Sequence, residues 1–120
     1  MMSSFLWGRL RGFGFAAKGA FLLLKNEASI QVQAVIAILM TFAGFYFNLS
    51  SNEWMMQVFA IGLVMSAEGL NTAIEEIANF VHPDFNKKIG YIKDVAAGAV
   101  FFAALSAVII GCFIYFPKFK

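Results

Sequence analysis

Three long apolar stretches divide the chain. Residues 30–49 and 95–116 contain no charged side chain, and residues 54–81 stay uncharged as far as Glu68. At ~1.5 Å per residue, a helix of about 20 residues spans a hydrocarbon core ~30 Å thick. The pattern therefore predicts three transmembrane helices, one in each of these ranges.

Short polar segments separate the predicted spans. In the first, Ser50 and Glu53 have the spacing of a capping box, which satisfies free backbone amides at the start of a helix. Trp54 follows as an interfacial anchor. Pro83 ends the second span, because proline disfavours helical geometry in the residue before it. We expect residues 84–94 to form a polar connection.

Residues 4–25 have a different pattern, in which four basic side chains lie among aromatic and aliphatic ones. Arg11, Lys18 and Lys25 lie seven positions apart, so they form one helical stripe that drifts only ~20° per step. A basic stripe opposite aromatic residues is typical of a helix lying in the membrane interface. We expect that position for residues 4–25; an ordinary helix of the bundle is the alternative.

Lysine and arginine positions predict the orientation, because cytoplasmic loops carry an excess of both. The N-terminal segment carries four of these residues and residues 82–94 carry three, whereas residues 48–53 carry none. We therefore expect the N-terminus and the second connection in the cytoplasm. Three spans then place the C-terminus outside, despite Lys118 and Lys120.

Composition agrees with a single membrane domain over residues 1–120. The chain is 61% hydrophobic and 13% charged, whereas a soluble domain has about 25% charged residues. The net charge of +2 is too small to indicate a nucleic-acid partner. One cysteine, Cys112, excludes an internal disulfide. No cleavable signal peptide is expected, because Arg9 and Arg11 follow the first apolar residues instead of preceding them.

Carboxylates gather near the predicted cytoplasmic ends of the spans. Glu68 follows fourteen uncharged residues of the second span, and a carboxylate at that depth is a functional candidate because burying it is costly. Glu68, Asn71 and Glu75 are spaced i, i+3, i+7, which places them on one helical face about 10.5 Å long. Glu76 points ~100° away, and we expect it to be a solvated partner for a lysine. The alternative for Glu68 is a structural hydrogen bond to a neighbouring helix.

Residues from the other helices are expected at the same depth. Glu27 ends the first helix, and two carboxylates from different helices can hold Mg²⁺ together with water and substrate phosphates. A glutamate at the lipid boundary can also act as a base toward a lipid hydroxyl. Lys93 and Asp94 open the third span, where the lysine can meet phosphate and the aspartate can accept from a base or ribose; a simple snorkelling anchor is the alternative. The residues thus predict a metal and anion site that opens to the cytoplasm and reaches the bilayer, without naming its reaction.

A non-enzymatic membrane protein is the competing class. A small transporter or assembly subunit could use Glu68 to couple protons or cations. The acidic residue of a transporter is expected near the midplane, whereas Glu68 is placed near the cytoplasmic end. A coupling residue would also not require Glu27, Asn71, Glu75 and Lys93 at one depth.

Two sequence motifs resemble a known family. Residues 68–75 read EGLNTAIE and match the pattern E-x-x-N-[ST]-A-[IL]-E of the small prokaryotic diacylglycerol kinases. Residues 93–100 read KDVAAGAV and are similar to the K-D-x-x-x-x-A-V segment of that family. Upstream, Lys18-Gly19 and Asn26-Glu27-Ala28 match its first helix, so the likeness covers nearly the whole chain.

The resemblance implies an ATP-dependent lipid kinase that is unrelated to soluble kinases. It implies an all-α homotrimer of protomers, each with an N-terminal interfacial amphipathic helix and three transmembrane helices, and active sites shared between protomers in a bacterial inner membrane. The implied roles by position are Mg²⁺ and ATP binding for Glu27 and Glu75, general base for Glu68, substrate positioning for Asn71, and nucleotide contacts for Lys93, Asp94 and Arg9.

The chain departs from the family pattern at two positions. The family often has arginine where this chain has Gln31, and aspartate where this chain has Asn79. These changes put local polar contacts in doubt but leave the metal site intact. The run Ala96-Ala97-Gly98 looks closer to the undecaprenol kinase branch than to the diacylglycerol kinase branch. We therefore expect undecaprenol as the lipid alcohol, with diacylglycerol as the alternative.

Overall fold

The computed structural model describes residues 1–119, and all regular structure in that range is helical. This confirms the all-α prediction. The elements are α1 (Met2–Asn26), α2 (Ala28–Tyr46), α3 (Ser51–Val81), α4 (Lys87–Tyr115) and the short 3-10 helix η1 (Phe116–Phe119).

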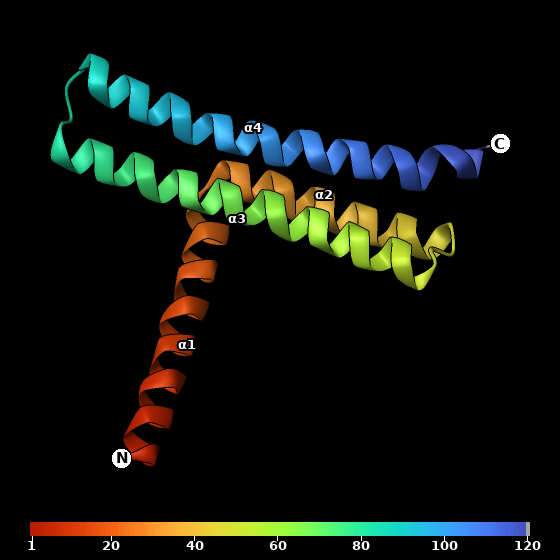
Figure 1. Cartoon of the computed structure of the whole chain (residues 1–120), viewed down its shortest axis with the longest axis horizontal. Helices are drawn as coiled ribbons and strands as arrows, with labels where there is room; N and C mark the ends of the chain where they lie inside the picture. The colour runs from red at the N-terminus through yellow and green to blue at the C-terminus, as the bar shows by residue number, and fades with distance from the viewer. Residues whose placement is uncertain (120) are drawn as a thin grey trace.

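Helices α2, α3 and α4 lie side by side, and α1 leaves this bundle steeply (Figure 1). The bend lies at Glu27, whose backbone is extended with φ −108° and ψ 117°. Gln31 stabilises the bend, because its side-chain amide donates to the carbonyls of Leu24 and Lys25, each at 3.0 Å. Carbonyls in the last turn of a helix have no partner within the helix. Gln31 therefore caps the end of α1 from the first turn of α2.

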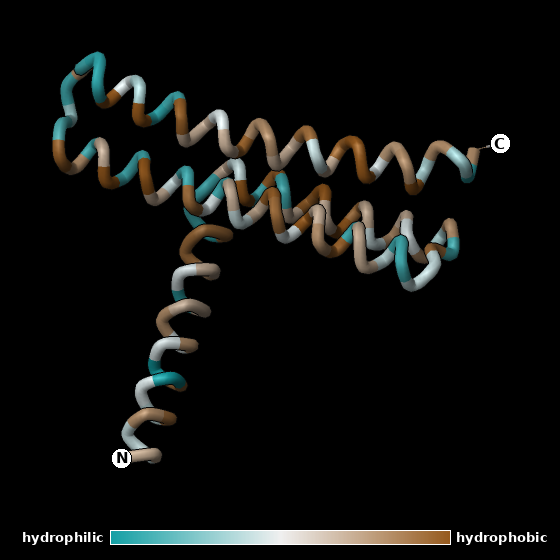
Figure 2. The backbone as a smooth tube through the Cα atoms, viewed as in Figure 1, coloured by the Kyte–Doolittle hydropathy of each residue, from teal (hydrophilic) through white to brown (hydrophobic). Residues whose placement is uncertain are grey.

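The direction of α1 fits the predicted interfacial position. A helix that leaves a membrane-spanning bundle steeply runs along the membrane surface. None of its residues is buried in the protomer, and its apolar and polar residues alternate along its whole length (Figure 2). The helix covers Met2–Asn26, slightly more than the expected residues 4–25.

Three helices of the described chain are long and apolar enough to cross a membrane, namely Ala28–Tyr46, Ser51–Val81 and Lys87–Phe119. This agrees with the three predicted spans. Their hydrophobic residues extend along the bundle, and hydrophilic residues gather where α3 turns into α4 (Figure 2).

The spanning helices differ in length. Helix α2 has 19 residues and α3 has 31, which correspond to about 28 Å and about 46 Å. Only the length of α2 matches a hydrocarbon core of ~30 Å. Both helices meet at residues 47–50, here called the outer turn because it lies at the end of the bundle away from α1. The other end of α3 projects past the start of α2 together with α4 (Figure 1). The expected span at residues 54–81 lies within α3, whose full length exceeds the thickness of the hydrocarbon core.

The outer turn shows why α2 ends at Tyr46 and not at residue 49 as expected. Asn48 has φ 54°, a left-handed conformation that asparagine tolerates better than most residues. The next helix begins with the predicted capping box. The Ser50 amide donates to a Glu53 carboxylate oxygen at 2.9 Å, and the Glu53 amide donates to the Ser50 hydroxyl at 3.2 Å.

The prediction of a polar connection over residues 84–94 is wrong for most of its length, because α4 begins at Lys87. The side-chain oxygen of Asn86 accepts from the amide of Lys88 at 2.8 Å and from that of Ile89 at 3.4 Å. Asparagine is a favoured residue at this capping position. The expected span at residues 95–116 thus lies within a longer helix.

Small residues hold α3 and α4 together in the most extensive helix contact of the described chain. Ala78 and Ala96 are 4% and 7% exposed, and Ala60 and Ala103 are each 6% exposed. Small side chains allow helix backbones to approach closely in lipid. The α3–α4 hairpin is therefore packed along its length, including the part that projects beyond α2.

The C-terminal end of the described chain packs against the outer turn and the first turn of α3. The Lys118 ammonium lies 3.1 Å from both carboxylate oxygens of Glu53, and the rings of Phe119 and Phe47 are 5.3 Å apart. Lys118 is thus compensated by a carboxylate at that end of the bundle.

We predict that Gly44→Ala lowers the thermal stability of the detergent-solubilised protein. A Cβ atom at Gly44 would lie 2.8 Å from Cζ2 of Trp54, so the indole ring must move. Overpacking of this kind costs about 1–3 kcal/mol. Gly62→Ala is the matched control, since a Cβ atom there meets nothing within 4 Å. Equal melting temperatures for both variants would contradict this packing.

Candidate active site

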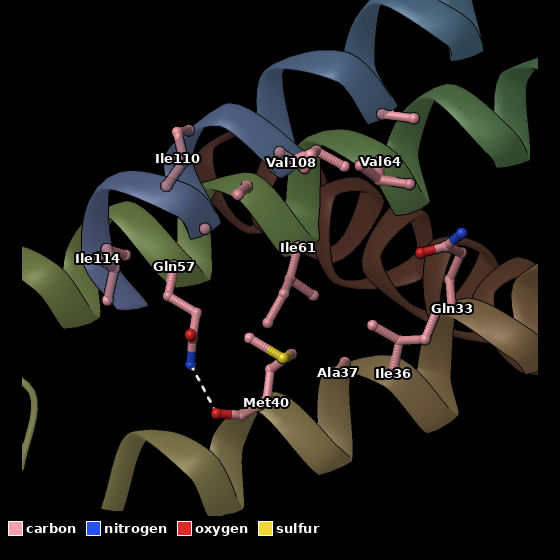
Figure 3. A pocket seen from close by; sticks show the side chains of 14 residues that line it. Gln33, Ile36, Ala37, Met40, Gln57, Ile61, Val64, Val108, Ile110 and Ile114 are labelled. Carbon is pink, nitrogen blue, oxygen red and sulfur yellow. Dashed lines mark hydrogen bonds between the residues drawn. The ribbon is translucent and has the colours of Figure 1, made fainter. Parts of the chain in front are cut away.

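A cavity of about 320 Å³ lies between α2, α3 and α4 (Figure 3). Most of its wall is apolar, and Gln33 and Gln57 are its polar members. Gln57 is only 5% exposed; its side chain donates to the Met40 carbonyl at 2.9 Å and accepts from the Tyr115 hydroxyl. These hydrogen bonds join all three helices near the end of the cavity that faces the outer turn.

One face of α3 lines this cavity and continues beyond it. Gln57, Ile61 and Val64 belong to the cavity wall and are spaced by four and three residues. Residues at these spacings share a helix face. The same alternation continues along α3 to the predicted site residues, so we define the cavity face of α3 as residues 57, 61, 64, 68, 71 and 75.

The other two helices bring site residues to the same end of the cavity. On α4, Ala104, Ala107 and Gly111 line the cavity, and the same three- and four-residue spacing leads back through residues 100 and 97 to Lys93. On α2, the cavity wall begins at Gln33, and Glu27 directly precedes the helix. Glu27 and Lys93 therefore lie beyond the walls of the cavity, on the side opposite the outer turn.

A contact between α1 and α3 gives the depth of Glu27. A Cβ atom built on Gly69 would lie 3.1 Å from Cδ1 of Leu23, so the end of α1 lies against α3 beside Glu68. The Glu27 amide donates to the Leu23 carbonyl at 3.0 Å. Glu27 and Glu68 thus lie at the same level of the bundle, where α1 meets it.

Asn71 and Glu75 form a hydrogen-bonded pair on α3. The Asn71 side-chain amide donates to a Glu75 carboxylate oxygen at 2.7 Å. A carboxylate only accepts, which fixes the Asn71 nitrogen toward Glu75 and leaves its carbonyl oxygen on the other side. That Oδ1 atom is buried, and nothing in the described residues donates to it. This oxygen can therefore accept a hydrogen bond from a ligand or coordinate a cation.

The oxygen ligands of the candidate site are suited to a hard metal ion that also coordinates substrate phosphates. No group of three His, Cys, Asp or Glu side chains converges within residues 1–119, so the protomer offers no complete metal cage over that range. Mg²⁺ usually takes one or two carboxylates and fills its shell with water and phosphate oxygens. Glu75 and the Asn71 oxygen fit part of this type of site, whereas Glu27 lies nearer the level of Glu68.

The predicted nucleotide residues are placed differently. The Lys93 ammonium donates to the Asn79 side-chain oxygen at 2.7 Å, which links α4 to α3 one turn beyond Glu75. Asp94 is exposed on the adjacent face of α4. Arg9 lies 18 residues before Glu27, or about 27 Å along α1, and stacks on the Phe5 ring at 5.3 Å. One protomer therefore does not bring Arg9 to the other site residues.

Glu76 and His82 lie outside this set. The expected lysine partner of Glu76 is absent from residues 1–119, where the one ion pair joins Glu53 and Lys118. The predicted lysine partner is therefore not found, and Lys93 of α4 bonds to Asn79. The His82 ring nitrogen lies 2.9 Å from the Asp84 carbonyl, which agrees with a role in the turn.

Sequence reasoning did not assign roles to Asn79, Gln31 and Leu23. Asn79 had a usable signal, because it lies four residues after Glu75 and so extends the polar part of the cavity face. No signal in the sequence indicates the contact of Leu23 with Gly69, because this contact depends on the angle at which α1 meets α3.

Comparison with known proteins gives this arrangement a context. A profile of the prokaryotic diacylglycerol kinase family matches residues 14–115. The chain belongs to this family. Undecaprenol kinase of Bacillus subtilis (strain 168) is 35% identical over 108 residues, covering 90% of this chain and 88% of that protein. Diacylglycerol kinase of Escherichia coli (strain K12) is 26% identical over 110 residues, covering 92% and 90%.

A further relative is the diacylglycerol kinase of Synechocystis sp. (strain ATCC 27184 / PCC 6803 / Kazusa). It is 28% identical over 109 residues, covering 90% of this chain and 62% of that protein. Family membership makes this chain an integral membrane lipid kinase, an ATP-dependent phosphotransferase. The cavity face of α3 therefore carries its candidate active site.

Proposed function

We propose that the chain transfers the γ-phosphoryl group of ATP to the hydroxyl of undecaprenol and so forms undecaprenyl phosphate. The observation that carries this proposal is the continuity of the cavity face of α3, from an apolar cavity among the spanning helices to Glu68, Asn71 and Glu75. A long-chain alcohol has the same division into an apolar tail and a polar head. The 35% identity to an undecaprenol kinase supports the choice of acceptor.

Glu27 and Glu75 would hold Mg²⁺ and thereby the phosphates of ATP. The ion supplies neutralisation of phosphate charge, which phosphoryl transfer needs more than covalent catalysis. Asn71 orients the Glu75 carboxylate through its 2.7 Å hydrogen bond. Its free buried oxygen would accept from the lipid hydroxyl or add to the ligands of the ion.

Glu68 is the proposed general base. It lies one helical turn from Val64, which lines the cavity, so a tail in the cavity places its hydroxyl beside the carboxylate. Glu68 accepts the hydroxyl proton as the alcohol oxygen attacks the γ-phosphorus. The bond from that phosphorus to the β,γ-bridging oxygen breaks, and ADP leaves with the electron pair.

Lys93 and Asp94 are proposed to bind the nucleotide from the start of α4. Lys93 would meet the phosphates, and Asp94 would accept from the base or ribose. Arg9 is too far along α1 to join them within one protomer, so we assign it to the site of a neighbouring protomer. This assignment requires the expected homotrimer, with α1 of one copy reaching the bundle of the next.

The exposed surface of the protomer supports an oligomer in a membrane. Large apolar side chains are exposed on every helix, including Phe42 on α2, Phe59 on α3 and Phe102 on α4, at 68%, 64% and 70%. Lipid and neighbouring protomers together would cover them. The basic residues of α1 and of the α3–α4 hairpin would place the end of the bundle opposite the outer turn on the cytoplasmic side of a bacterial inner membrane. The candidate active site lies at that end.

Diacylglycerol is the second candidate acceptor. It also presents a primary hydroxyl at the interface and an apolar tail, and the Escherichia coli relative is named for it. The transporter reading is less favoured, because Glu68 lies where α1 meets the bundle and not midway along the spanning part of α3.

We predict that undecaprenol is phosphorylated more efficiently than diacylglycerol in mixed micelles with Mg²⁺ and ATP. The measurement is transfer of labelled γ-phosphate to each lipid under identical conditions, compared as kcat/KM. Higher efficiency with diacylglycerol would transfer the assignment to that lipid. No transfer to either lipid alcohol would refute the proposed reaction.

We also predict that Glu68→Gln lowers kcat by about 10²- to 10⁴-fold, the usual contribution of a general base. Binding of Mg²⁺ and ATP should remain close to that of the unaltered protein, because Glu68 is not a proposed ligand. Glu76→Gln is the control, since it removes a carboxylate of the same helix from outside the cavity face. Loss of nucleotide affinity in Glu68→Gln would show that the base assignment is wrong.

A further inference from the structure

The line of residues that forms the cavity face of α3 continues along the helix beyond Glu75. Asn79 follows four residues later, so it lies on the same face, one turn and about 6 Å further from the cavity. It lies in the last turn of α3, and this end of α3 projects past the start of α2 (Figure 1). Asn79 is therefore the next polar group beyond the proposed metal ligand Glu75.

The side chain of Asn79 has a defined partner on the opposite helix. The Lys93 ammonium donates to Asn79 Oδ1 at 2.7 Å across the α3–α4 interface. Lys93 is half-buried and makes no ion pair within residues 1–119. An ammonium has three N–H donors, so this hydrogen bond leaves two of them and the whole positive charge for another ligand.

Other contacts also hold the hairpin together at the level of this hydrogen bond. Ala78, next to Asn79, is 4% exposed, and Ala96, one turn from Lys93, is 7% exposed. These small residues already pack the two helices together at this level. Asn86 caps the start of α4 separately. The Asn79–Lys93 bond therefore determines where the lysine side chain points more than whether the helices meet.

We propose that Asn79 is a positioning residue that holds the Lys93 ammonium toward the phosphates of ATP. A carboxamide orients the lysine through one hydrogen bond without neutralising its charge, which a polyanionic ligand then meets in full. This proposal rests on the proposed function, which gives Lys93 its nucleotide contact, and it adds Asn79 to the residues that determine nucleotide affinity.

The test is steady-state kinetics of the full chain in mixed micelles with Mg²⁺, ATP and a lipid alcohol. We expect Asn79→Ala to raise KM for ATP roughly ten-fold, the effect of losing one hydrogen bond to a charged group. The values of kcat and of KM for the lipid should stay near those of the unaltered protein. Asn79→Asp keeps an oxygen acceptor but neutralises the ammonium, so its KM for ATP should lie above that of the unaltered protein and below that of Asn79→Ala.

A double-mutant cycle decides whether Asn79 acts through Lys93. Lys93→Ala should raise KM for ATP, and adding Asn79→Ala should raise it no further. Glu76→Ala, an exposed site on another face of α3, is the control for general effects on the helix. Thermal unfolding of each variant shows whether it is folded, and Asn79→Asp carries the test if Asn79→Ala is not.

Two results would overturn the proposal, and they differ in their meaning. If Asn79→Ala raises KM for ATP equally with and without Lys93, Asn79 does not act through the lysine, while the nucleotide role of Lys93 stands. If Lys93→Ala leaves KM for ATP unchanged, the proposed nucleotide role of Lys93 is wrong, and the role of Asn79 fails with it. A fall in kcat alone for Asn79→Ala would also contradict positioning of the nucleotide.

Discussion

The difference in length between α2 and α3 determines where the chemistry can take place. The two helices share the outer turn, but α3 has 31 residues and α2 has 19. From Ser51 to Gly69, α3 rises about 27 Å, close to the thickness of a hydrocarbon core. We therefore expect Glu68 at the membrane boundary, and Glu75 and Asn79 beyond it. With that placement, a single helix face passes from lipid to water, as the proposed phosphorylation of a membrane lipid requires.

The bend between α1 and α2 determines where Glu27 lies relative to α3. Because Gln31 caps the last carbonyls of α1, the chain can turn at Glu27 and place that carboxylate beside α3. The contact of Leu23 with Gly69 fixes the same level from the other side. The two departures from the family pattern thus have structural consequences, since Gln31 stabilises the bend and Asn79 receives Lys93.

Local chemistry explains which features the sequence could predict. The capping box at Ser50 and Glu53 involves neighbouring residues only, and the common face of Glu68, Asn71 and Glu75 follows from helical periodicity. The predicted start of α4 is too late because the four charged residues among 87–94 exclude this segment from an apolar span, although Asn86 is a typical cap. The pairing of Asn79 with Lys93 and the distance of Arg9 from the bundle depend on how whole helices are arranged. No spacing along one helix contains that information.

The depth of α3 can be measured directly. Leu63, Leu70 and Ile77 lie seven residues apart and are 36%, 67% and 62% exposed, so each can be replaced by cysteine in a Cys112→Ser background and carry a nitroxide. Relaxation by oxygen and by a water-soluble nickel complex then reports the depth of each label in a lipid bilayer. We expect a label at residue 63 in the hydrocarbon, at residue 70 near the boundary and at residue 77 in water. A label at residue 77 deep in the hydrocarbon would contradict the position of the active site at the membrane surface.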